Sequence, residues 1–212
     1  MGWCAAALAG GHFDVDDAGT LAPGECQYEL WGGHGKPRSI DFFHLGPACR
    51  VGAVELGLNL DLAQGTLDRA DLIGPQLKWN YFGQEEGAPL AAAIALGAVY
   101  DYRKDGRWGG QLLLPFTWQA LDSLVLNANV GLDWLPVEGT RSGRGGLGID
   151  WSFHPQLSLL AEHNRAFDLW TTRVGLRWSI TPTISLDASV ARVHSEGVRL
   201  FTVGINQSFS RP

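Results

Sequence analysis

The sequence has few charged residues, no long apolar run and no excess of basic residues. Charged residues make up 18% of its 212 residues, against about a quarter in typical soluble domains. No apolar stretch approaches the roughly 20 residues of a membrane-spanning helix, which excludes a helical membrane protein. The net charge of −6 argues against a nucleic-acid-binding protein, which needs a basic surface. The six histidines show no metal-ligand spacing, so we expect neither a metal site nor another cofactor.

Long stretches of alternating apolar and polar residues fill much of the chain, most clearly between residues 124 and 209. A period of two sustained over such lengths predicts β-strands with one apolar and one polar face. The apolar series of the four clearest runs are Leu124, Leu126, Ala128, Val130, Leu132 and Trp134; Leu147, Ile149, Trp151 and Phe153; Trp170, Thr172, Val174, Leu176, Trp178 and Ile180; and Ile184, Leu186, Ala188 and Val190.

Three features favour a membrane barrel over a secreted β-sandwich with core tryptophans. The runs reach about ten residues, the length that a tilted strand needs to cross a bilayer. Their polar face consists mostly of Gly, Ser, Asn and Asp, which suits a crowded interior. Tryptophans lie near strand ends on the apolar face, with Trp134 and Trp170 at one rim and Trp118, Trp151 and Trp178 at the other. We therefore predict an all-β, antiparallel up-and-down transmembrane barrel of about 12 strands over residues 25–209, in the bacterial outer membrane.

The N-terminal residues precede the predicted strands. Residues 1–9 are interpreted as the end of a truncated signal peptide, with Ala7-Leu8-Ala9 as the cleavage site and Cys4 removed with it. The basic region of a signal is missing, so either the true start lies upstream or the stretch is not a signal. Residues 10–24 are acidic and rich in turn formers, and we expect them to form a periplasmic lead-in to the barrel.

The second strand is the weakest of the pattern. We expect the first strand at residues 25–31, a short irregular one at residues 39–45, and a periplasmic turn at residues 46–50. An even strand number, as bacterial single-chain barrels have, places both termini in the periplasm. Further periplasmic turns are expected at residues 83–89, 120–123, 154–156 and 181–183, and outer loops at residues 32–38, 64–69, 103–107, 137–143, 165–168 and 195–197.

Two cysteines remain once the presumed signal is removed. Cys26 begins the first strand and Cys49 lies in the expected turn between the second and third strands, so both fall at the periplasmic rim. An even number of cysteines in an oxidising compartment predicts a disulfide, with two free thiols as the alternative.

Short motifs near the N-terminus resemble a family of proteobacterial outer-membrane proteins. They are Asp16-Asp17-Ala18-Gly19-Thr20, Pro23-Gly24, Cys26-Gln27-Tyr28-Glu29, and Cys49 followed by Val54-Glu55-Leu56. On these residues the chain resembles the transporters of the phenol-degradation meta-pathway family. The resemblance implies a barrel associated with uptake of small, often aromatic, compounds.

The alternation also predicts which charged residues line the lumen. Arg173 and Arg177 lie on a strand flanked by those of Glu162 and Asp187, so opposite charges can meet across neighbouring strands. This set serves either as a salt-bridged interior that holds the barrel's shape or as an acid-biased lumen that favours cations and neutral solutes. The predicted inward set is Glu25, Glu29, Glu55, Asp61, Lys78, Asp101, Asp133, Asp150, Glu162, Arg173, Arg177 and Asp187.

We expect a monomeric channel for a small-molecule solute, with the lipid bilayer as its partner and no enzymatic activity. The first alternative is a structural barrel plugged by side chains. The second is a lipid-active hydrolase, for which His194-Ser195-Glu196 and the Glu162-His163 pair are the nearest candidates. Consecutive residues on a strand point to opposite faces, so neither set can converge on a substrate.

Overall fold

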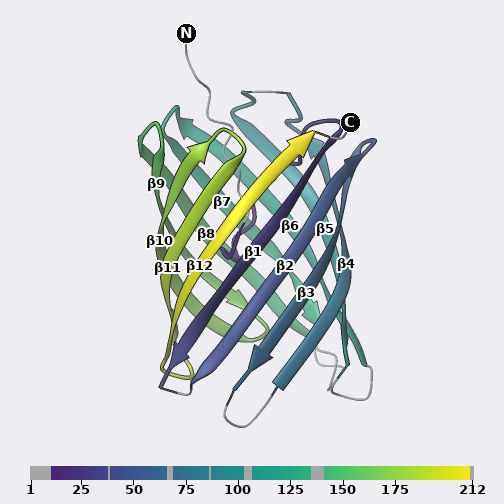
Figure 1. The fold of residues 1–212 in the computed structure, drawn as a ribbon. Helices are drawn as coiled ribbons and strands as arrows, with labels where there is room; N and C mark the ends of the chain where they lie inside the picture. Colours follow the sequence, from purple (N-terminus) through teal and green to yellow (C-terminus); the bar gives the residue numbers. More distant parts are fainter. Residues whose placement is uncertain are drawn as a thin grey trace.

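The computed structural model describes residues 11–37, 39–65, 69–85, 87–102, 107–134 and 141–210. These residues form a closed antiparallel barrel in which each strand pairs with its neighbours in sequence and β1 pairs with β12 (Figure 1). The fold class and strand number predicted from the alternation are confirmed. The strands are β1 (Glu25–Lys36), β2 (Ile40–Val51), β3 (Val54–Gln64), β4 (Arg69–Phe82), β5 (Leu90–Asp101), β6 (Arg107–Leu121), β7 (Leu124–Trp134), β8 (Arg141–His154), β9 (Leu157–Ala166), β10 (Leu169–Thr181), β11 (Ile184–Val193) and β12 (Val198–Ser210).

The outer surface of the barrel is apolar and the inner surface is polar. On β10 the outward Val174 and Leu176 are half exposed, whereas the inward Arg173 and Arg177 are buried. Tryptophans are exposed toward both ends of the outer surface, with Trp170 at one end and Trp118 at the other. An exposed apolar band bordered by aromatic side chains is the surface that a bilayer covers. No helix long and apolar enough to cross a membrane occurs among the described residues.

The two rims differ in the length of their connections. At the rim that carries the end of β12, shown at the top of Figure 1, several turns have only two residues, as at residues 122–123 and 182–183. Connections at the other rim are longer on average, including residues 135–140 between β7 and β8. Short periplasmic turns and longer outer loops are the rule in outer-membrane barrels. This difference agrees with the predicted topology, in which the short-turn rim is the periplasmic one.

The β1–β2 hairpin differs from the prediction. β1 continues to Lys36 and β2 continues to Val51, so residues 46–50 lie within a strand and the turn is at Gly52, whose φ is +63°. Gly46 and Pro47 suggested a turn, but Pro47 is accommodated because the β2–β3 ladder has no pairs at these two residues. The missing proline N–H therefore costs no ladder hydrogen bond.

Cys26 and Cys49 form the predicted disulfide. They are directly opposite each other on β1 and β2, and their Cα atoms are 4.0 Å apart. Cys49 lies in the strand rather than in a turn. The bond joins the first hairpin near the periplasmic rim, on the outward face that also carries Phe209, the β12 neighbour of Cys26.

Candidate functional site

The barrel interior carries the charged side chains that the alternation predicted, together with others that it missed. Arg144 and Arg50 also point inward, from the start of β8 and the end of β2. Both fall in or beside segments expected to be loops. Arg144 is nevertheless an even number of positions from Gly146 and Gly148, so the alternation would have placed it on the same inward face. The inward set predicted from the sequence occupies inward positions of β1, β3, β4, β5, β7, β8, β9, β10 and β11: Glu25, Glu29, Glu55, Asp61, Lys78, Asp101, Asp133, Asp150, Glu162, Arg173, Arg177 and Asp187.

Buried ion pairs join neighbouring strands across the interior. Arg177 donates from Nε and Nη2 to the two carboxylate oxygens of Asp187 at 2.7 and 2.9 Å. Arg173 Nε donates to Glu162 Oε1 at 3.0 Å. The predicted contacts between these arginines and the acids of the flanking strands are confirmed, because each pair is directly opposite in the ladder.

Two further interior contacts involve residues outside the predicted inward set. His44 is buried inside, with its ring stacked on Trp31 at 4.4 Å and its Nδ1 2.6 Å from Asp61. Arg144 Nη1 donates to Asp133 Oδ1 at 3.2 Å, toward the outer end of the barrel. Both carboxylates of these pairs belong to the predicted inward set.

The N-terminal segment, residues 11–22, lies inside the barrel. In Figure 1 its purple trace runs inside the ring of strands. The prediction of a periplasmic lead-in for residues 10–24 is therefore corrected for residues 11–22, and residues 1–9, the expected signal, lie outside the described residues. The segment has no strand periodicity and pairs with no strand, so the wall's polar groups are the partners that its backbone can find.

Wall side chains accept hydrogen bonds from the backbone of this segment. Val15 N donates to Glu162 Oε2 at 2.8 Å, and Leu21 N donates to Glu55 Oε2 at 2.9 Å. Asn129 makes two bonds with Asp16, accepting from its N–H and donating to its carbonyl, both at 2.7 Å. The acids at Glu55 and Glu162 thus serve as acceptors for the segment, a role that the alternation could not indicate.

Ion pairs add to these bonds. Lys78 Nζ is 2.9 Å from Asp16 Oδ1 and 3.1 Å from Asp17 Oδ1. Arg173 Nη2 is 3.3 Å from Asp14 Oδ2, in addition to its contact with Glu162. The acidic residues of the segment therefore neutralise cations of the wall.

Glycines in the wall make room for the segment's apolar side chains. A Cβ added at Gly148 would lie 3.3 Å from the Val15 Cβ, and one added at Gly175 would lie 2.9 Å from the Phe13 ring. Val15 and Ala18 are buried in the described structure, at 6% and 0% exposure. Beside the segment, the crevice next to Val15 and Arg144 has no room for a water molecule. The described part of the lumen is therefore filled at this level.

Burial changes the acid–base properties of two segment side chains. Loss of hydration of the imidazolium and, to a smaller extent, the nearby charge of Arg173 together lower the pKa of His12 to about 4. His12 Nε2 lies 2.6 Å from Ser189 Oγ. Burial raises the pKa of Asp17 to about 6, against the opposing effect of Lys78. Insertion therefore disfavours the charged forms of both side chains.

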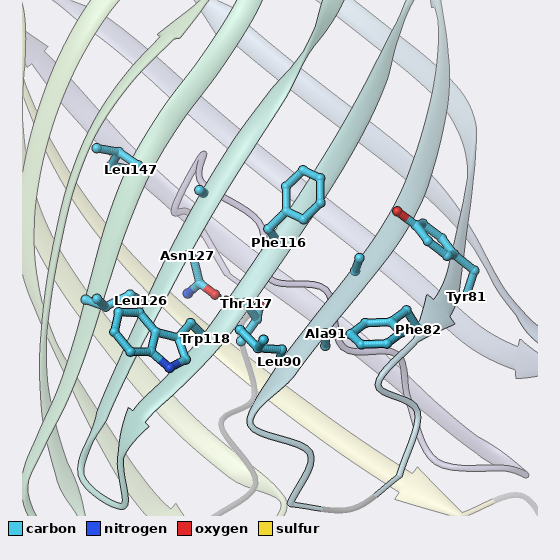
Figure 2. A pocket seen from close by; sticks show the side chains of 12 residues that line it. Tyr81, Phe82, Leu90, Ala91, Phe116, Thr117, Trp118, Leu126, Asn127 and Leu147 are labelled. Atoms are coloured by element: carbon cyan, nitrogen blue, oxygen red, sulfur yellow. Dashed lines mark hydrogen bonds between the residues drawn. The ribbon is translucent and has the colours of Figure 1, made fainter.

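A groove opens on the outer surface. It measures about 450 Å³, and most of its lining residues face outward near the periplasmic rim, as Figure 2 shows for Leu90, Phe116 and Trp118. Small Ala92 and Ala128 lie between larger neighbours and create the hollow. It is part of the lipid-covered wall and does not connect with the lumen's charged groups.

The candidate hydrolase residues do not form a triad. Glu162 points inward to Arg173, whereas the neighbouring His163 is exposed on the outside. His163 Nδ1 and His194 Nε2 each lie 2.8 Å from the Thr172 hydroxyl on the outer surface. This contact between the two histidines and the threonine was not foreseen, because it depends on the register of β9 and β10. Within the described ranges, no group of three or more His, Cys, Asp and Glu side chains could hold a metal ion.

Comparison with solved structures shows that the fold is shared with bacterial outer-membrane β-barrels. The KdgM porin in complex with disordered oligogalacturonate is similar with a TM-score of 0.68 and 12% identity, covering 86% of this chain and 99% of that one. The NanC porin gives 0.63 and 10%, covering 85% and 98%. Outer membrane phospholipase A from Escherichia coli gives 0.58 and 12%, covering 89% and 98%. The shared fold and the apolar outer surface agree on a location in the outer membrane.

The chain belongs to the family described as "Uncharacterised conserved protein UCP029691", whose model matches residues 2–209. No curated protein matches the chain.

Proposed function

We propose that the protein is an outer-membrane channel for small solutes whose lumen is closed at rest by residues 11–22. One observation carries the proposal: a continuous chain segment lies in the lumen, bound to the wall through hydrogen bonds and ion pairs such as Lys78–Asp16.

The segment can leave without disrupting the barrel. Every strand pairs with two neighbours in the closed ladder, and the segment contributes no strand to it. Its polar contacts exchange for contacts with water on release, and each such hydrogen bond contributes only about 1 kcal/mol net. Wall side chains, in contrast, cannot be removed from the lumen. The arrangement therefore suits a gate more than a permanent filling.

The charges of the wall favour neutral or cationic solutes. Among the described inward side chains, acids outnumber the bases Arg50, Lys78, Arg144, Arg173 and Arg177. Release of the segment also removes Asp14, Asp16 and Asp17 from the lumen. An acidic wall suits the oligogalacturonate named with the KdgM porin poorly, because that ligand is itself acidic. The resemblance to the phenol-degradation meta-pathway family keeps small aromatic compounds among the candidate solutes.

We propose further that the channel is a monomer without enzymatic activity. A single chain closes the barrel, so no partner is needed to complete the lumen. The fold shared with outer membrane phospholipase A makes a hydrolase the second candidate, with Thr172 between His163 and His194 as its nearest feature. No carboxylate contacts either imidazole in the described residues, so the orienting group of a triad is missing. Release of fatty acid from phospholipid vesicles by the wild type, lost in Thr172→Val, would favour the hydrolase.

Planar-bilayer recordings test the channel. We expect the wild type to open rarely and a variant lacking residues 12–21 to conduct continuously, with cation preference in a salt gradient. Added salt should weaken that preference, because it screens the wall charges. The matched variant keeps the length of the chain but replaces these ten residues by Gly and Ser. It lacks the side-chain contacts with the wall, so its conductance should also rise. A folded deletion variant that does not conduct would support the structural barrel, and anion preference would reject the acidic lumen.

A further inference from the structure

Three basic residues stand side by side on the outer surface at the end of the barrel opposite the end of β12. Arg192 on β11 is directly opposite Arg199 on β12, and Arg199 is directly opposite Lys36 on β1. Figure 1 shows these three strands next to one another, with their outer ends at the lower rim. We name Lys36, Arg192 and Arg199 the rim cations.

The rim cations point away from the lumen. Ala191 and Val198, next to Arg192 and Arg199 in the chain, are 1% and 2% exposed on the inside, whereas the rim cations are exposed. One step closer to the membrane centre, the outward pair is Val190 and Phe201, part of the apolar band. The rim cations therefore lie where the lipid-covered band ends, at the level of lipid headgroups.

The position of these charges is unfavourable without an anion. Like charges directly opposite each other on neighbouring strands repel. Two other outward cations at this rim have acidic partners, since Arg69 Nε lies 3.1 Å from Asp71 and Arg165 pairs with Asp168. None of the rim cations makes an ion pair in the part of the chain that the structure describes. A row of three unpaired cations at headgroup level fits an external anionic group.

We propose that the rim cations bind the phosphate groups of lipopolysaccharide in the outer leaflet. The guanidinium groups of Arg192 and Arg199 can each hold a phosphate through two parallel hydrogen bonds, and Lys36 adds a third positive charge. The lipid's acyl chains would then lie against Val190 and Phe201. The long-loop rim faces the outer leaflet, where the phosphorylated headgroup is a sugar anchored by several chains, so one molecule can contact both the cations and the apolar band.

Native mass spectrometry of the folded protein in detergent tests the site. The probe is purified lipopolysaccharide, compared with the same lipid after enzymatic dephosphorylation. Each basic residue contributes roughly fivefold to the binding of an anionic lipid surface. Arg192→Gln with Arg199→Gln should therefore weaken binding roughly thirtyfold. Arg69→Gln with Arg165→Gln is the matched control, because it removes the same charge from cations that are already paired, and it should change affinity little.

Three results would overturn the proposal: equal loss in both double variants, equal binding of the dephosphorylated lipid, or equally tight binding of phosphatidylglycerol. The last would indicate a general anionic-lipid surface. Millimolar inorganic phosphate should compete only weakly, since it lacks the acyl chains. If the rim double variant does not fold, the single variants Lys36→Gln and Arg192→Gln should each weaken binding roughly fivefold, and unchanged binding in both would equally reject the site.

Discussion

Arg177 and Asp187 form a buried ion pair whose removal should be costly. Both are almost fully buried, and the two hydrogen bonds between them are 2.7 and 2.9 Å long. Arg177→Gln leaves a buried carboxylate without its cation, and we expect it to lower the free energy of unfolding by about 3–5 kcal/mol. Adding Asp187→Asn should recover most of that loss. The measurement is urea unfolding in lipid vesicles, followed by tryptophan fluorescence.

Arg199→Gln serves as the comparison in that measurement. It removes an exposed cation with no described ion pair, so in vesicles without lipopolysaccharide the free energy of unfolding should change by less than about 0.5 kcal/mol. Similar losses in Arg177→Gln and Arg199→Gln, or a double variant no more stable than Arg177→Gln, would contradict the role of the pair.

His12 and Asp17 give insertion of the segment two pH dependences of opposite sign. The pKa of His12 is about 4 when inserted and 6.5 ordinarily, so protonation of the released segment weakens insertion as pH falls from about 6.5 to 4. The pKa of Asp17 is about 6 when inserted and 3.8 ordinarily, so insertion strengthens as pH falls from about 6 to 4. The two effects oppose each other in the wild type.

Single substitutions should separate these effects. In His12→Gln only Asp17 remains, so the open probability in bilayers should fall on acidification from pH 7 to 4. In Asp17→Asn only His12 remains, and the open probability should rise. Each change should reach roughly a hundredfold at most, because the pKa of each inserted side chain differs from its ordinary value by roughly two. The two variants having the same pH profile would show that these side chains do not control insertion.

The charged interior could be predicted residue by residue because it follows a local rule. Period-two alternation assigned Arg173 and Glu162 to the inside, and adjacent strands brought them to 3.0 Å. Arg50 was missed because the predicted second strand ended too early, and Arg144 was missed because the predicted start of the β8 strand was too late. The contact of Thr172 with His163 and His194 depends on inter-strand register, which one sequence does not reveal.

At the level of elements, the disulfide fastens the first hairpin. It closes a loop of 23 residues between Cys26 and Cys49, for which the chain-entropy relation gives about 3 kcal/mol. Cys26→Ser with Cys49→Ser should lower the free energy of unfolding by that amount and leave the lumen unchanged. Reduced wild type should unfold at the same urea concentration as the variant. Equal stability of oxidised and reduced wild type would show that the bond does not stabilise the hairpin.

The elements differ in how well they could be predicted. Strands such as β10 and β11 follow from alternation, and two-residue turns follow from Pro155 and Pro182. β2 was cut short because Gly46 and Pro47 are turn formers that the interrupted β2–β3 ladder tolerates. Insertion of residues 11–22 could not be foreseen, because a segment without periodicity gives no indication of what it binds. The many wall glycines were the available signal, and they were interpreted as fitting a crowded interior.

At the level of the whole molecule, the barrel wall and the inserted segment of residues 11–22 are structurally independent, because the segment contributes no strand to the barrel. The closed ladder satisfies its own backbone groups, as a bilayer requires. The segment occupies the polar space within, and its acids balance Lys78 and Arg173. The proposed gating therefore depends on whether the solute path passes through the place that the segment fills.

A redox-controlled cross-link tests that claim most directly. A Cβ at position 148 would lie 3.3 Å from that of Val15, close to the Cβ separation in disulfides, so Val15→Cys with Gly148→Cys should cross-link the segment to the wall. The measurement is single-channel current through this variant before and after reduction, with wild type under the same reductant as the control for Cys26–Cys49. We predict no openings in the oxidised variant and a return of openings on reduction. The same current in both redox states, with the cross-link verified by mass, would contradict gating by the segment.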